Sequence, residues 1–347
     1  MRDDVLVVEG SDEALLDWSM EHGAGDGLPI LAPTPERVER MVAAGPYPPD
    51  KVLGVLAPRW APATVRKVAA NAVMAGCRPD YFPVVLAAVE AMADPALDLE
   101  GISSSTGPHA LMVMISGPIC RRIGVNCGYG CMGPGWRANA TIGRAVSLIQ
   151  HNVAGCVPGQ VSMSSHAQPG RYTFCFGENE EETPWPPYRS EMRLGERESC
   201  VTVAGVVSRL SLMQRGVPGE SPETLLGYYG LAAPSVLLEV IGGGPRGLVF
   251  VLGPNHAARL AHAGWTRDRI RHYLFAQVNG LPEERLPPLL RADAAKWGLV
   301  RDGCVTLVSR PDDIRIWVSG GPGGHHSVLL CTRRWPVTRV VVEQGGP

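Results

Sequence analysis

The chain has 347 residues, 45% of them hydrophobic, and a formal net charge of −2 at pH 7. This length and composition indicate a globular protein with a sizeable core, and the near-neutral charge argues against nucleic acid or a membrane surface as a partner. No apolar run approaches the roughly 18–20 residues that a membrane-spanning helix needs. The acidic start of the chain is not typical of a signal peptide, so we predict a cytoplasmic location.

The first third of the sequence predicts helices that are separated by turns rich in Gly and Pro. A Thr-Pro-Glu sequence at residues 34–36 is typical of a helix start, and this helix should run to about residue 44. Apolar residues recur at helical spacing over residues 61–75 and again over residues 79–93. Cys77 lies in the tight corner between these two predicted helices.

Short apolar runs then alternate with helical segments. Residues 111–115, 172–176 and 200–207 have the composition of strands, and a long helix is predicted from Asn139 to about residue 152. The polar, acidic and Pro-rich segment at residues 178–198 is typical of a loop or linker.

The second half of the chain repeats this order. Residues 248–252 and 314–318 predict strands, and these two, like the strand at residues 111–115, run into turns that contain a Gly-Pro pair. We therefore predict an α/β fold with two α/β halves, residues 1–199 and 200–347, and mixed or parallel sheets flanked by helices. Duplication is one origin of such a repeat. Glycine-rich loops at strand ends favour a ligand crevice there.

The sequence contains none of the common signatures of serine hydrolases, zinc proteases, NTPases or dinucleotide-binding enzymes. One weaker pattern predicts an anion site. Its glycines let the backbone approach a ligand, its helix start offers free N–H groups, and its arginine adds a cation. The alternative is an ordinary capped helix with a surface arginine. The residues concerned are Gly133, Gly135, Arg137, Asn139 and Thr141.

A second pattern suggests acid–base chemistry. Glu178 and Glu180 follow the strand at residues 172–176, and they share one face if the strand continues. The alternative is a solvated acidic loop. His326, in the glycine-rich turn after the strand at residues 314–318, is a further candidate for proton transfer, as are the loop histidines His109, His256 and His325.

A third candidate is a thiol. Cys77 precedes a helix start and is followed by Arg78, and both features favour a thiolate with a lowered pKa. Burial in the corner is the alternative, and it would raise the pKa. Cys127 and Cys131 form a C-x3-C pair whose spacing differs from zinc and redox motifs, so a structural or incidental role is favoured for them.

Segments spread over most of the chain carry a resemblance: residues 25–29, 71–79, 81–86, 133–135, 137–144, 174–176, 178–181, 320–323 and 326–327. These segments resemble an uncharacterised bacterial family. Its members look like companions of small redox proteins that carry a Cys- or selenocysteine-Gly-Ser-Cys motif. The resemblance implies a redox or sulfur-linked setting and identifies no reaction. This chain has Cys127 and Cys131 where similar proteins tend to have Ser and Ala, and its His109 is displaced.

These patterns together predict a cytoplasmic enzyme that acts on a small anionic substrate in a crevice between the two halves. Arg137 and the helix start at Asn139 would hold the anion, Cys77 would be the nucleophile or redox thiol, and Glu178, Glu180 or His326 would move protons. One alternative is a metal-dependent lyase or hydrolase that uses the two glutamates and His326. Another is a non-catalytic subunit that docks a small redox protein. The sequence identifies no cofactor, metal or oligomeric state, although a homo-oligomer is compatible with it.

Overall fold

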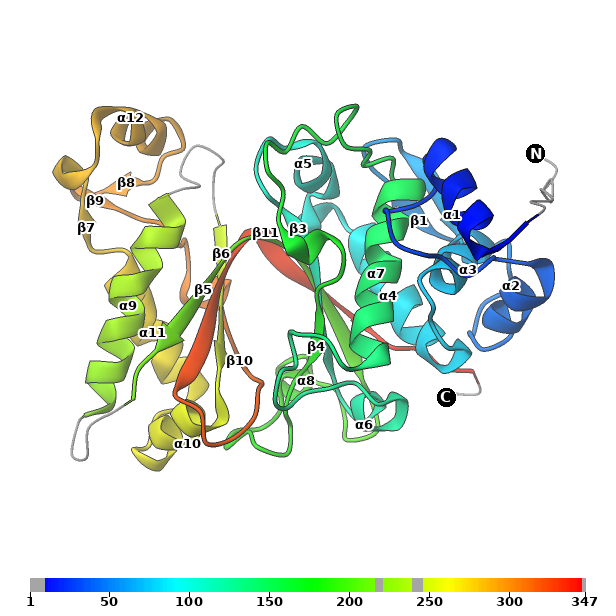
Figure 1. Cartoon of the computed structure of the whole chain (residues 1–347). Coiled ribbons are helices and arrows are strands. Elements are labelled where there is room, and N and C mark those ends of the chain that lie inside the picture. Colours follow the sequence, from blue (N-terminus) through cyan, green and yellow to red (C-terminus); the bar gives the residue numbers. More distant parts are fainter. Residues whose placement is uncertain (1–9, 216–220, 239–245, 345–347) are drawn as a thin grey trace.

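The computed structural model describes residues 10–215, 221–238 and 246–344. Its centre is a curled, mixed sheet of six strands in the order β10-β6-β11-β5-β3-β4, with helices packed on both sides (Figure 1). This architecture confirms the predicted α/β fold. The strands of the sheet are β3 (Ala110–Ser116), β4 (Cys175–Gly177), β5 (Cys200–Met213), β6 (Arg246–Leu252), β10 (Ile314–Val318) and β11 (His326–Val340).

The pattern of parallel and antiparallel pairing is the same from both edges of the sheet. β3 pairs in parallel with the edge strand β4 and antiparallel with β5. In the same way, β6 pairs in parallel with the edge strand β10 and antiparallel with β11. The two long strands β5 and β11 pair with each other and join the two groups into one sheet. The repeat therefore lies within a single continuous sheet, and the domain division at residues 199 and 200 stays a prediction.

Helices cover the outer faces of the sheet near its two ends (Figure 1). One group comprises α1 (Asp12–Glu21), α2 (Pro35–Val42), α3 (Val65–Met74), α4 (Phe82–Met92), α5 (Leu99–Ser104), α6 (Ile119–Ile123) and α7 (Arg137–Asn152). The other comprises α9 (Pro222–Leu238), α10 (Pro254–His262), α11 (Arg267–Val278) and α12 (Pro288–Lys296), and α8 (Tyr188–Glu191) lies in the loop after β4. The short strands are β1 (Val52–Leu56), β2 (Ala61–Thr64), β7 (Leu281–Pro282), β8 (Val300–Arg301) and β9 (Cys304–Val305).

Alternating side chains divide the interior into three hydrophobic clusters. In β3, Leu111 and Val113 pack under α3, α4 and α7, whereas Met112 and Met114 point into the concave side of the sheet. Trp317 of β10 belongs to the same concave cluster, while its neighbours in the strand pack against the second group of helices. The period of two residues thus builds a core on each face of the sheet.

The curl of the sheet brings the ends of its two edge strands together. Just beyond β4, the Asn179 N–H donates to the Val318 carbonyl of β10 at 2.8 Å. A second hydrogen bond runs in the opposite direction, from the Ser319 hydroxyl beyond β10 to the Gly177 carbonyl of β4 at 2.8 Å. This joint places loops from both ends of the sheet side by side, next to the end of β3.

Several local predictions are confirmed and others need correction. The predicted strands at residues 111–115, 248–252 and 314–318 form as β3, β6 and β10. Residues 61–64 form β2 instead of the first turn of the predicted helix, because Thr64 caps α3 by accepting the Lys67 N–H at 3.3 Å. The strand expected at residues 172–176 is shorter and begins at Cys175.

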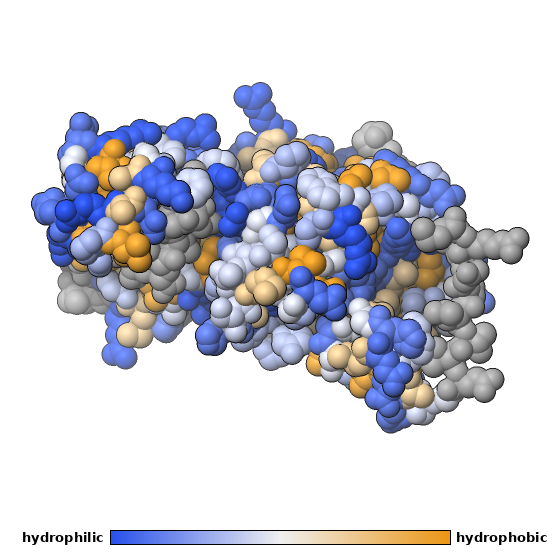
Figure 2. Space-filling view, turned by 90° about the horizontal axis from the view of Figure 1, so that it is seen from above, coloured by the Kyte–Doolittle hydropathy of each residue, from blue (hydrophilic) through white to orange (hydrophobic). Residues whose placement is uncertain are grey.

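Within the described ranges, no helix is long and apolar enough to cross a membrane. Seen from above, the surface carries hydrophobic residues in small groups among hydrophilic ones (Figure 2). The predicted cytoplasmic location was based on the acidic start of the chain, and this segment lies outside the described residues.

Candidate functional site

A pocket of about 500 Å³ opens where β3 and β4 end, and we call it the acidic pocket. Carboxylates and thiols line it together with the turn at Gly117 and Pro118 that follows β3. The side chains that give it its chemistry are Cys120, Arg121, Cys127, Glu178, Asn179, Glu180 and Glu181.

Strand pairing brings the two predicted glutamates to the end of β3. β3 and β4 run in parallel, and the Glu178 N–H continues their pairing by donating to the Ile115 carbonyl at 2.8 Å. The hydroxyl of Ser116, the last residue of β3, then lies 2.6 Å from Glu178 Oε2 and 3.0 Å from Glu180 Oε1. Ser116 therefore bridges two carboxyl groups that lie two residues apart in the sequence.

One proton shared by the two carboxyl groups would complete the hydrogen bonding of this bridge. The Ser116 hydroxyl carries one hydrogen, which both carboxyl groups can accept in a three-centre hydrogen bond. A proton on one carboxyl group would add a second hydrogen and give each contact a hydrogen bond of its own. The three side chains are fully satisfied when Glu178 and Glu180 share a single proton.

Glu178 is the buried member of the pair, with 1% of its surface exposed. Burial raises the pKa of its carboxyl group above the ordinary value of 4.5, and the negative charge of Glu180 raises it further. Arg267, Ser116 and the backbone N–H of Tyr188 act in the opposite direction. The Tyr188 N–H donates to both carboxyl oxygens at 2.9 Å, so the orientation of Glu178 is fixed.

Glu180 is the more exposed member, with 24% of its side chain accessible to solvent. The buried Arg189 holds it, since Arg189 Nε donates to the two carboxyl oxygens of Glu180 at 3.1 and 3.3 Å. The acidic pocket thus has an inner carboxyl group and an outer one that is accessible to a bound molecule.

Two thiols also line the acidic pocket. Cys120 of α6 is buried, Cys127 is half-buried, and a Cβ on Gly177 would meet both sulfur atoms. The neighbouring Cys127 thiol and burial raise the pKa of Cys120 well above its ordinary range. Cys131, the other cysteine of the C-x3-C sequence, is buried, and its sulfur lies 3.2 Å from the hydroxyl of Ser319. Sequence analysis did not single out Cys120, although its position just after the Gly117-Pro118 turn is a signal that it could have used.

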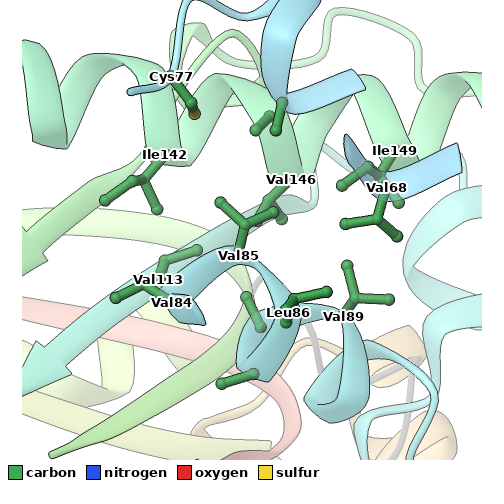
Figure 3. Close-up of a cluster of buried hydrophobic side chains, with 14 of the residues drawn as sticks. Val68, Cys77, Val84, Val85, Leu86, Val89, Val113, Ile142, Val146 and Ile149 are labelled. Carbon is green, nitrogen blue, oxygen red and sulfur yellow. The ribbon is translucent and has the colours of Figure 1, made fainter. Parts of the chain in front are cut away.

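The expected thiolate at Cys77 is not supported, and the prediction of a lowered pKa is wrong. Cys77 is 6% exposed and packs beside Ile142 and Val146 of α7 (Figure 3). Its thiol donates to the Thr141 carbonyl at 3.2 Å. Burial raises the pKa of Cys77 to about 12, and the positive charges of Arg137 and Arg144 do not outweigh this effect.

The predicted anion site folds as a tight junction between α7 and the Cys77 corner. Arg137 begins α7, and its Nε and Nη2 atoms both donate to the Gly76 carbonyl at 3.1 and 3.0 Å. The Thr141 hydroxyl donates to the Arg137 carbonyl at 2.8 Å. In the preceding turn, Gly133 donates to the Gly130 carbonyl, and Gly135 has a φ of +117°, which favours glycine. Neither pocket described here includes these residues in its lining.

Asn139 does not cap the helix, and this prediction also needs correction. The N-cap of α7 is Trp136, whereas Asn139 lies inside the helix and is 3% exposed. Its side chain accepts the Asn126 N–H at 2.8 Å and donates to the carbonyls of Asn126, Cys131 and Cys175. Asn139 therefore fixes the loop that carries Cys127 against the start of β4.

The predicted histidines lie apart from the two glutamates. His326 is exposed at the start of β11 and is not part of the lining of the acidic pocket. His256 is buried, and its Nδ1 lies 2.8 Å from the hydroxyls of both Tyr229 and Ser327. Among the described residues, no group of three or more His, Cys, Asp or Glu side chains could hold a metal ion.

Comparison of the whole chain with protein-family models and with curated proteins finds no match.

Proposed function

We propose that this chain is an enzyme that transfers protons to or from a small molecule bound in the acidic pocket. The observation that carries the proposal is the Ser116 bridge, which holds Glu178 and Glu180 at 2.6 and 3.0 Å and is satisfied by one shared proton. Many enzymes that use general acid–base catalysis have a pair of carboxyl groups in different environments, one charged and one protonated.

The two carboxyl groups have different roles in this proposal. Glu180 is the outer group and exchanges the proton directly with the bound molecule. Glu178 is the inner group, and its raised pKa lets it hold the proton that Ser116 passes between the two. Arg189 and Arg267 are positioning residues, because each holds one glutamate in place through the hydrogen bonds of its guanidinium.

The charge of the pocket bears on the substrate class. Arg121 lines the pocket and could bind an anion, but it already pairs with Glu181. The carboxylates favour neutral or cationic groups beside Glu180. The anionic substrate predicted from the sequence stays a proposal, and Arg121 is the only residue of the pocket lining that supports it.

Deuterium exchange tests the proposed activity without a known substrate. The purified protein is incubated in heavy water with a mixture of small metabolites, and mass spectrometry detects molecules that gain deuterium or change mass. We expect the Glu180→Gln variant to lose every such conversion. Glu182→Gln is the matched control, because Glu182 is an exposed neighbour outside the pocket lining. Equal conversion by wild type and Glu180→Gln would contradict the proposal, as would the absence of any conversion by the wild type.

A second candidate function is a thiol-linked reaction, which the closeness of Cys120 and Cys127 favours. The two thiols would form one disulfide and transfer two electrons and two protons to an oxidant such as glutathione disulfide, which would leave as two thiols. Incubation with glutathione disulfide should lower the intact mass by two hydrogens. This loss should be absent in Cys120→Ser and Cys127→Ser and should persist in Cys304→Ser. A small redox protein is the partner that this reading implies.

Two further alternatives from the sequence stay proposals. A metal-dependent lyase or hydrolase would use Glu178, Glu180 and His326, and elemental analysis of the purified protein tests it. A non-catalytic subunit that docks a redox partner would show no conversion in heavy water and no dependence on Glu180.

A further inference from the structure

A second pocket, of about 720 Å³, lies between the end of α1, the loop at residues 22–26, α7 and the loop at residues 153–172. We call it the loop pocket. It shares no lining residue with the acidic pocket. Apolar side chains form much of its wall, among them Met20, Val157, Pro158 and Tyr172.

Most polar side chains that line the loop pocket have partners within the protein. Asp26 accepts two hydrogen bonds from Arg144, both at 2.8 Å. Gln150 donates to the Ser103 hydroxyl at 3.0 Å, and a ring nitrogen of His151 lies 3.0 Å from the Gly23 carbonyl. These groups are therefore satisfied without a ligand.

Arg171 differs from them, because it brings a half-buried charge to the pocket wall, and no carboxylate among the described residues pairs with it. Its Nε donates to the His109 carbonyl at 2.8 Å and its Nη1 to the Ser162 hydroxyl at 2.7 Å, so its partners are neutral. Its Nη2 is buried and has no hydrogen-bond partner among the described residues. Burial lowers the pKa of the guanidinium, and the neighbouring Cys156 acts in the opposite direction.

A partly buried charge without a counter-charge is unfavourable, and an oxyanion is the group that a guanidinium fork fits best. We propose that the loop pocket binds a small molecule with an apolar body and a carboxylate or similar oxyanion, with Arg171 as the anion-binding residue. The apolar wall accepts the body of the ligand, and the anionic head supplies the missing counter-charge. This inference does not rest on the proposed proton transfer by Glu178 and Glu180.

Fluorescence titration with anilinonaphthalene sulfonate, an apolar molecule with an oxyanion, tests the proposal. We expect one site per chain in the wild type and an affinity at least about tenfold lower in Arg171→Met, because the charge-assisted contact is lost. Arg171→Lys keeps the charge and should retain most of the affinity. Octanoate should displace the probe, and octanol, which has a similar chain and no charge, should displace it much less.

Two variants keep the test decisive if Arg171→Met folds poorly. Ser147→Trp places a large side chain in the pocket wall without touching Arg171, and the structure gives no hydrogen bond from Ser147 that it would break. It should abolish probe binding. Arg78→Met, at an exposed arginine that pairs with Asp80, is the matched control and should bind the probe like the wild type. Unchanged binding in both Arg171→Met and Ser147→Trp, or equal displacement by octanol and octanoate, would overturn the proposal.

Discussion

Arg267 and Glu178 form a buried ion pair across the joint of the sheet, with 3.0 Å between Nη2 and Oε1. They are 89 residues apart in the sequence, and their side chains are 6% and 0% exposed. Arg267 begins α11, in the second group of helices, whereas Glu178 follows β4 in the first part of the sheet. The pair therefore links the two parts of the chain at the candidate acid–base group.

Removing Arg267 should destabilise the whole protein. Arg267→Met leaves the buried Glu178 carboxylate without its cation, and loss of one partner of a buried ion pair typically costs about 3–5 kcal/mol of unfolding free energy. Urea denaturation of Arg267→Met, Glu178→Gln and the double variant measures this cost. The double variant should lose less stability than the sum of the two single variants.

The exposed pair of Arg78 and Asp80 provides the control for this cycle. Arg78→Met should change stability by no more than about 1 kcal/mol, since exposed ion pairs contribute little. If Arg267→Met costs no more than Arg78→Met, the joint is not held by the buried pair.

Replacement of Asn139 should loosen the loop that carries Cys127. Asn139→Ala leaves the buried N–H of Asn126 without its partner, and an unsatisfied buried group costs roughly 1–3 kcal/mol. The variant also removes one of two donors to the Asn126 carbonyl, which keeps the Gly177 N–H at 3.3 Å. We expect a loss of at least about 2 kcal/mol of unfolding free energy. Asn139→Asp keeps the acceptor and loses the donor, so it separates the contributions of the two sides of the amide. A change within about 0.5 kcal/mol for Asn139→Ala would mean that these hydrogen bonds do not hold the loop.

Cys77 should resist alkylation. Its pKa of about 12 leaves almost no thiolate at neutral pH, and its sulfur is buried. Cys127 and Cys304 are partly exposed and should react first with iodoacetamide, as measured by mass spectrometry after brief treatment of the folded protein. Labelling of Cys77 before these two thiols would restore it as a candidate nucleophile.

The sequence predicted strands whose residues are mostly apolar, and it missed the long strand β11. That strand contains Arg333, Arg334 and Pro336, which interrupt the apolar alternation. Its stability comes from pairing with β5 and β6 on both sides, and such non-local pairing leaves no local signal in the sequence.

The candidate site shows the same division between local and non-local information. Glu178 and Glu180 are recognisable as carboxylates after a strand, but their bridge to Ser116 depends on the parallel pairing of β3 with β4. Asparagine is a common N-cap residue, which is why Asn139 was predicted to begin the helix. In the structure it lies inside the helix, where its side chain bonds to Asn126. The corner position of Cys77 was predicted, and its burial was left open, because burial depends on the packing of α7.

Stability should depend on pH through Glu178. Its pKa is raised in the folded protein, so the folded state binds this proton more tightly than the unfolded state does. The contribution is fully present below pH 4.5, the ordinary value, and is lost as the pH rises through the folded-state pKa. Urea midpoints of the wild type relative to Glu178→Gln should therefore decrease over this window. A relative midpoint that increases with pH would show that the pKa of Glu178 is lowered.

The most direct test of the proton-sharing pair is an NMR titration of the carboxyl carbon of Glu178. We predict a midpoint above 4.5 in the wild type and a lower midpoint in Glu180→Gln, because that variant removes a negative charge that raises the pKa of Glu178. Glu182→Gln should leave the midpoint unchanged. A wild-type midpoint at or below 4.5, or a midpoint that is the same in Glu180→Gln and Glu182→Gln, would contradict the account.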